Sequence, residues 1–250
     1  MKIYNSKSFF VAIITFIASS FVISCGGDDE EDDSIQISSS KDLSLYSDEV
    51  SQIQCNKKGV TYESENAFVA TVSNSGEIKA NHVGSTHIKV NGNEMIKVTV
   101  TPRYINFDEP VLDFGVSINK VKALEKNNPI KEEKEGLAYD GTGDENGRIY
   151  IFKDGKLYLS AMIVQPTKSS FLENFLVERY VPIDVDRSKP SILFVNGLTD
   201  ETITMIIEFT VEKNLFVVRY FPWDGSATRS IFQIEDETLA KMKKFLEEEY

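Results

Sequence analysis

The chain is poor in the residues that most often carry enzyme chemistry. Its 250 residues include two Cys, two His and one Trp. Both Cys and both His precede residue 103, so residues 103–250 contain neither residue type. This excludes a Ser-His-Asp triad, a Cys-His pair and the usual zinc sites from that part of the chain. We expect no catalytic activity and no cofactor.

Positive charge is also scarce. Lys and Arg total 27 against 39 Asp and Glu, which gives a net charge of −12 at pH 7. Such a chain repels phosphate backbones, so we expect no nucleic-acid partner. Hydrophobic residues still make up 41% of the chain, which is enough for folded cores and excludes wholesale disorder. A length of 250 residues accommodates about two domains.

The first 24 residues have the pattern of a secretion signal. Two Lys precede an apolar run over Phe9–Val22, which is shorter than a typical membrane-spanning helix. The run ends in Val22-Ile23-Ser24-Cys25, which resembles the lipobox of bacterial lipoprotein precursors. The resemblance implies that residues 1–24 are a cleaved signal peptide and that Cys25 receives the lipid. An uncleaved signal anchor is the alternative.

An acidic tether follows Cys25. Residues 25–34 contain the run Asp28–Asp33, in which every residue is Asp or Glu. Like charges at this density form a solvated tether and no packed fold. The run also resembles the surface-export signal of Bacteroidetes lipoproteins. This resemblance implies a lipoprotein anchored in the outer membrane and exposed at the cell surface.

Residues 35–102 consist of short apolar runs separated by Ser, Asn and Gly turns, which predicts an all-β sandwich. The motifs Tyr62–Asn66, Val69–Val72, Ser75–Ala80 and Gly84–Ile88 follow an order similar to that of bacterial Ig-like group 2 domains. The resemblance implies an Ig-like domain that acts as a spacer or, alternatively, as an adhesin. Strands are expected at Ile35–Ser38, Asp42–Leu45, Ser51–Cys55, Ala67–Val72, Gly76–Ala80, Ser85–Val90 and Met95–Thr101.

Residues 103–250 predict an α+β domain with an internal repeat, so the fold class of the whole chain is mixed. Each half has a helix followed by three strands, and we expect one antiparallel sheet with both helices on one face. Ser117 is expected to cap the first helix, and Ser170–Glu173 forms a capping box for the second. Helices are expected over 118–127, 170–180 and 237–249, and strands over 136–139, 148–152, 156–164, 191–196, 202–211 and 215–221.

The first half of this domain weakly resembles the architecture shared by small protein A and the β-lactamase inhibitor protein. The residues that carry the resemblance are Phe114–Ser117, Val121 and Tyr150–Leu157, with the hairpin signal Asp154-Gly155 inside the last of them. Members of such folds are mostly binding or assembly proteins. The resemblance implies the architecture and assigns no functional residue.

The candidate ligand contacts are Trp223 and Tyr220, at the end of the last predicted strand. An aromatic side chain at such a position can stack on a sugar or anchor a protein partner, and core packing is the alternative. The loop Asp140–Gly147 has Glu145 where an EF-hand requires Gly, so we expect no metal site. Cys55 is expected to be a small buried residue. His82 and His87 are expected at the surface or in turns.

Three functional interpretations follow. The favoured one is a non-enzymatic surface lipoprotein whose Ig-like domain presents a C-terminal domain that binds a ligand or a protein partner. The second is a glycan-binding accessory protein of a polysaccharide-capture system. The third is a glycoside hydrolase that uses two carboxylates. The sequence identifies neither the ligand nor the oligomeric state.

Overall fold

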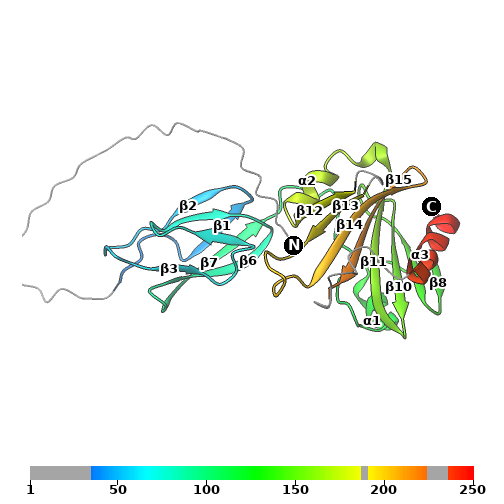
Figure 1. Ribbon diagram of the computed structural model, residues 1–250, viewed down its shortest axis with the longest axis horizontal. Coiled ribbons are helices and arrows are strands. Elements are labelled where there is room, and N and C mark those ends of the chain that lie inside the picture. The colour runs from blue at the N-terminus through cyan, green and yellow to red at the C-terminus, as the bar shows by residue number, and fades with distance from the viewer. Residues whose placement is uncertain (1–34, 187–190, 224–235) are drawn as a thin grey trace, which may run out of the picture.

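The computed structural model describes residues 35–186, 191–223 and 236–250, which form two folded units joined end to end (Figure 1). The first unit is an all-β sandwich, and the second is built on one eight-stranded sheet with three α-helices. The mixed fold class expected from the sequence is therefore confirmed. Within these described residues, no helix is long and apolar enough to cross a membrane.

The sandwich consists of a four-stranded and a three-stranded sheet around a core of aliphatic side chains. The larger sheet has the order β1-β7-β6-β3 and the smaller one the order β2-β5-β4. All pairs are antiparallel except β1 with β7. Ile78, Ile88, Ile96 and Val98 are fully buried between the sheets. The strands are β1 (Asp42–Tyr46), β2 (Val50–Gln52), β3 (Tyr62–Ser64), β4 (Ala70–Val72), β5 (Glu77–Ala80), β6 (Gly84–Val90) and β7 (Glu94–Thr101).

Two predictions for the sandwich were wrong. Residues 35–38 form no strand, and their pairing is limited to an isolated bridge between Ile37 and Cys55. The strand β3 was not predicted, because Tyr62-Glu63-Ser64 is short and lies beside Ser and Asn residues that favour turns. Gly76 lies in the turn before β5, with a φ of 81° that side-chain-bearing residues rarely adopt.

The second domain contains a single antiparallel sheet with the order β12-β13-β14-β15-β11-β10-β9-β8. Two four-stranded meanders meet where β11 pairs with β15, and this arrangement reflects the internal repeat. Each repeat thus has four strands where the sequence predicted three, because β8 and β12 were missed. The strands are β8 (Lys131–Glu133), β9 (Gly136–Asp140), β10 (Gly147–Lys153), β11 (Lys156–Val164), β12 (Val181–Asp186), β13 (Ser191–Val195), β14 (Met205–Glu212) and β15 (Leu215–Pro222).

The two repeats also share a hairpin turn. Asp154 and Gly155 connect β10 to β11 with φ of 50° and 73°, which confirms the predicted hairpin. Lys213 and Asn214 connect β14 to β15 with φ of 50° and 62°. Both turns therefore place two consecutive residues in the left-handed region, as two-residue hairpins require.

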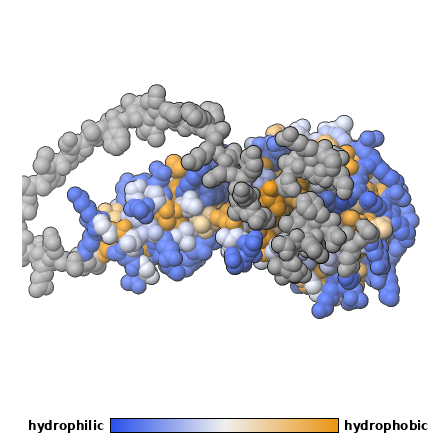
Figure 2. All heavy atoms as spheres, in the orientation of Figure 1, coloured by the Kyte–Doolittle hydropathy of each residue, from blue (hydrophilic) through white to orange (hydrophobic). Residues whose placement is uncertain are grey.

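The helices lie on opposite faces of the sheet. Helix α1 (Ile118–Leu124) and helix α2 (Leu172–Val177) pack on one face through Val121, Phe175 and Leu176. Helix α3 (Asp236–Glu249) packs on the other face, where Met242, Phe245 and Leu246 cover β9, β10 and β11. The expectation that the first two helices share one face is confirmed, and the α3–β8 end of the domain presents a densely hydrophilic surface (Figure 2).

The helix boundaries differ from the prediction. The Ser117 hydroxyl accepts a hydrogen bond from the N–H of Lys120 and caps α1 as predicted. Helix α1 nevertheless ends at Leu124, which is exposed. The predicted capping box at residues 170–173 does not form, because Phe171 occupies the N-cap and makes no capping bond. Helix α2 stops at Val177, and the chain returns directly into β12. A short 3₁₀ turn (Pro166–Lys168) precedes α2.

Candidate functional site

The two domains are joined by one buried carboxylate, that of Glu178 at the end of α2. It accepts hydrogen bonds from the backbone N–H groups of Arg103 (3.0 Å) and Tyr104 (3.2 Å). The backbone carbonyl of the same residue accepts a hydrogen bond from the N–H of Val83 in the Ig-like domain, at 2.8 Å. One residue therefore contacts the first domain, the connecting segment and the second domain at the same time.

The side chain of Arg103 strengthens this junction from the other side. Its guanidinium lies 3.0 Å from a carboxylate oxygen of Glu49 and 4.4 Å from the ring centroid of Tyr46, both in the Ig-like domain. The Glu178 carboxylate also pairs with the adjacent guanidinium of Arg179. Charge-assisted hydrogen bonds and a cation–π contact thus connect the two domains at this junction.

A groove of about 610 Å³ opens beside this junction. The size lies within the range of small-molecule pockets. Both domains and the connecting segment supply its walls, so the groove exists only when the domains are docked. It is lined by Ser47, Asp48, Ala67, Thr71, Lys79, Asn81, His82, Arg103, Tyr104, Asn174, Val177, Glu178 and Leu198.

The histidine of the groove is held in place by its neighbours. The His82 ring stacks on Phe68, with ring centroids 4.3 Å apart, and its Nδ1 lies 2.8 Å from the Phe68 carbonyl oxygen. Burial lowers the pKa of His82, although the hydrogen bond to Phe68 acts in the opposite direction. The lowered pKa favours the neutral form of the His82 ring. Exposed His87 pairs with Glu65 at 3.3 Å, and the two histidines do not converge.

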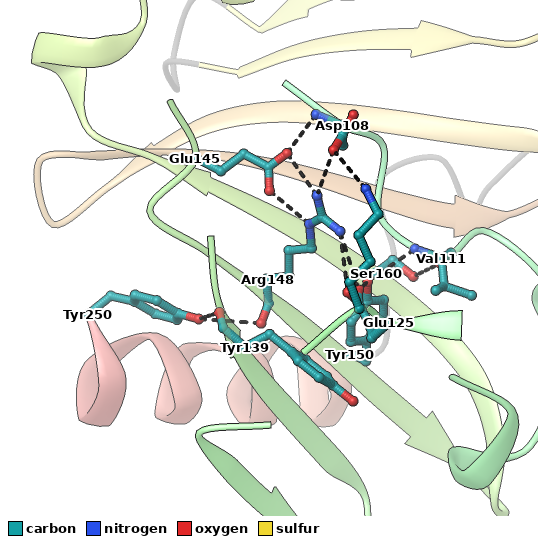
Figure 3. A network of polar contacts seen from close by, with 10 residues as sticks. Asp108, Val111, Glu125, Tyr139, Glu145, Arg148, Tyr150, Ser160 and Tyr250 are labelled. Atoms are coloured by element: carbon teal, nitrogen blue, oxygen red, sulfur yellow. Dashed lines mark hydrogen bonds and ion pairs between the residues drawn. The ribbon is translucent and has the colours of Figure 1, made fainter. Parts of the chain in front are cut away.

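A second cluster of polar side chains surrounds Arg148 on β10 (Figure 3). The guanidinium donates two hydrogen bonds to the carboxylate of Glu145, at 2.8 and 3.0 Å, and lies 3.4 Å from the carboxylate of Glu125. The hydroxyl of Tyr150 also donates to Glu125. Glu145 in turn accepts a hydrogen bond from the backbone N–H of Asp108 at 2.7 Å. We call Glu125, Glu145, Arg148 and Tyr150 the arginine cluster.

The arginine cluster is a structural anchor. The side chain of Glu145 has no exposed surface and that of Glu125 is 7% exposed. Burial raises the pKa of Glu145, while the bonds from Arg148 oppose this shift. Burial likewise raises the pKa of Tyr150 far above its ordinary value. Because both carboxylates bind one guanidinium away from solvent, the cluster offers no open pair of acids for glycoside hydrolysis.

The structure places the two predicted ligand contacts differently. Tyr220 is fully buried in the core between α2 and the sheet, where its ring packs edge-on against Tyr180. It does not reach the surface in this structure. Trp223 is half-buried and packs beside Leu193, Val195, Ile203 and Ile206. A ligand contact at Trp223 stays a prediction. Neither residue lines the groove.

The other residues singled out in the sequence have structural surroundings. Cys55 is half-buried, with its Sγ 3.4 Å from the hydroxyl of Tyr62. The loop 140–147 joins β9 to β10 and turns the carboxylate of Glu145 inward onto Arg148. Among the described residues, no three His, Cys, Asp or Glu side chains gather in a way that could hold a metal ion. Cys25 and the acidic run Asp28–Asp33 lie outside the described residues.

Sequence reasoning missed the residues that matter most at the junction. The sequence analysis singles out neither Glu178 nor Arg103, because nothing in their local pattern signals long-range pairing. Glu178 lies 75 positions from Arg103 in the sequence. A partial signal was available at Glu178, because an acid among the apolar residues Leu176, Val177 and Tyr180 is unusual unless it has a buried partner.

Comparisons with known proteins support the first domain. Residues 34–101 match the model of the bacterial Ig-like domain (group 2), which confirms the resemblance drawn from the sequence. A solved structure of surface layer protein SbsC, domains 4–9, is similar over 78% of this chain and 27% of that chain, with 12% identity and a TM-score of 0.21. A comparison with curated proteins returns no match. The Ig-like domain indicates an extracellular or cell-surface protein.

Proposed function

We propose that the protein is a lipid-anchored cell-surface protein in which the Ig-like domain is a rigid stalk for a C-terminal binding domain. In this proposal Cys25 carries the lipid, residues 25–34 form the tether and the anchor lies in the outer membrane. The Ig-like domain at residues 34–101 and the lipobox-like sequence before Cys25 support this arrangement.

The observation that carries the proposal is the clamp at Glu178. A flexible hinge would leave the groups at the junction in water, whereas here the carboxylate of Glu178 is 4% exposed and accepts two backbone N–H groups. Hydrogen bonds to charged groups contribute about 1.5–3 kcal/mol each. A stalk held in this way fixes the direction in which the C-terminal domain faces, and this is useful when the partner is on another surface.

The experiment measures the distance between the two domains. Spin labels are placed at Glu63 and Lys168, which are exposed on the first and second domain respectively, in a variant whose two Cys are changed to Ser. Pulsed electron paramagnetic resonance is expected to give one narrow distance distribution. Glu178→Ala should broaden it, because the connecting segment loses its acceptor. Glu173→Ala, on the exposed side of the same helix, is the matched control and should leave the distribution unchanged.

Two results would contradict the proposal, the first its rigid stalk and the second its clamp at Glu178. The first is a broad distribution in the protein without the Glu178 change, which would show that the domains move independently. The second is an unchanged narrow distribution in Glu178→Ala, which would show that other contacts fix the orientation. Circular dichroism of each variant confirms that both domains remain folded.

A further inference from the structure

Exposed apolar side chains gather where the groove meets α2. Val177 and Leu198 line the groove with 41% and 42% of their surface exposed. Phe171, just before α2, is 45% exposed, and its ring lies 5.8 Å from that of Tyr104, which also lines the groove. Phe171, Asn174 and Val177 are spaced three apart, so they follow one side of the helix. Large apolar side chains clustered on a surface mark interaction sites.

The charges around this apolar wall are already compensated within the chain. Arg103 pairs with Glu49, and Glu178 pairs with Arg179. Lys79 and Asp48 lie 3.9 Å apart at the groove's edge. An ionic ligand would have to compete with these pairs for each contact. The groove therefore complements a segment without net charge.

Uncharged polar groups complete the lining. Asn174 lies between Phe171 and Val177, and its side chain has no hydrogen-bond partner among the described residues. Thr71 faces the same groove from the Ig-like domain, and its hydroxyl is likewise without a partner there. An Asn amide carries both a donor and an acceptor, so it can pair with both groups of one peptide unit. Aliphatic walls next to such an amide suit a peptide side chain and its backbone.

We propose that this groove, between α2 and the Ig-like domain, binds an extended and uncharged segment of a partner polypeptide through a bulky apolar side chain. The inference rests on the proposed function, since it names the kind of partner that the C-terminal domain would bind. The apolar side chain of the segment packs between Val177 and Leu198, and Asn174 pairs with its backbone.

Two other occupants fit the groove less well. A saccharide is bound mainly by flat aromatic faces, whereas the exposed large apolar residues that line the groove, Val177 and Leu198, are aliphatic. A lipid chain needs a continuously apolar lining, whereas charged and amide groups occur along this groove. The groove is continuous with the interface between the two domains and is present before any partner arrives. Binding therefore requires little reordering of the protein, which favours affinity.

The test uses the full chain, immobilised and panned against a phage-displayed library of random twelve-residue peptides. Enriched peptides are synthesised, and their affinity is measured by isothermal titration calorimetry. We expect enriched sequences to share a bulky apolar residue in an uncharged context. Leu198→Asp and Val177→Asp should each weaken binding at least tenfold, and Asn174→Ala should weaken it to a smaller extent. Leu124→Asp is the matched control, because Leu124 is 44% exposed but lies on α1, outside the groove.

Several results would overturn the inference. It is wrong if no peptide is enriched, or if the enriched peptides bind Leu198→Asp and Val177→Asp as tightly as the unchanged chain. It is also wrong if peptides fail and neutral oligosaccharides on a glycan array bind and are lost in the same variants, since the groove would then be a saccharide site. Thermal unfolding shows whether each variant is folded. None of these results changes the distance measured between the domains, so the two proposals fail separately.

Discussion

The arginine cluster allows a quantitative test of how the second domain is held together. Arg148→Met keeps most of the side-chain volume and removes the charge. It leaves the carboxylate of Glu145, which has no exposed surface, with the backbone N–H of Asp108 as its hydrogen-bond donor. It also leaves the carboxylate of Glu125 without its guanidinium. Removing one partner of a buried ion pair costs about 3–5 kcal/mol, and we expect a loss of stability in this range at pH 7.

The loss should depend on pH because Glu145 can take up a proton. Burial raises its pKa in the folded protein, and the bonds from Arg148 oppose that rise. Without Arg148 the folded-state pKa moves further above its unfolded value. The folded state then binds a proton more readily than the unfolded state, so stability falls as pH rises through the folded pKa. Lowering the pH from 7 to 5 should therefore restore part of the stability lost in Arg148→Met.

Urea unfolding monitored by tryptophan fluorescence measures this change directly. Trp223 is the only Trp in the chain and lies in the second domain, so its signal reports that domain. The double variant Arg148→Met, Glu145→Gln should recover part of the stability. Lys122→Met is the matched control, because it breaks an exposed pair with Glu132 and should cost less than about 1 kcal/mol. A loss below about 1 kcal/mol in Arg148→Met would refute the argument that the cluster anchors the fold.

Three further predictions concern the ends of the chain. Gly147→Ala should destabilise the second domain by about 1–3 kcal/mol in urea unfolding, because a Cβ at this position would lie 2.0 Å from the Tyr250 ring. Adding Gly147→Ala to a Tyr250→Ala background should cost less. Cys25→Ser should abolish incorporation of radiolabelled palmitate, and persistent labelling would disprove lipidation at this residue. Replacing the acids of Asp28–Asp33 with Ser should keep the lipid but protect the protein from protease added to whole cells, and unchanged cleavage would show that the run is only a tether.

The sequence predicted those elements whose signals are local. The hairpin at Asp154-Gly155 needs two residues at positive φ, and Asp-Gly is a residue pair that favours such turns. The cap at Ser117 and the helix α3 follow equally from short-range patterns. The strand β8 was missed because Lys131-Glu132-Glu133 is charged, as an edge strand that avoids pairing with other chains often is.

The candidate site was not predictable because its contacts are distant in the sequence. Tyr220 was chosen as a ligand contact for its aromatic ring, but on β15 alternate residues face α2, and this periodicity places Tyr220 in the core. The groove combines residues of the Ig-like domain, the connecting segment, α2 and the loop after β13. No local pattern indicates that these four parts of the chain meet.

Two buried acids organise the segment between the domains. The segment between the domains has no helix or strand from residue 102 to residue 117, and side chains of the second domain bind its backbone at three places. Glu178 accepts the N–H groups of residues 103 and 104, and Glu145 accepts that of residue 108. The hydroxyls of Tyr150 and Ser160 then hold the N–H and the carbonyl of residue 111. Two buried acids, each paired with an arginine, thus accept backbone N–H groups that a helix or a strand would otherwise bond. The irregular segment thus links the Ig-like domain to the sheet, and its residues Arg103 and Tyr104 also line the groove.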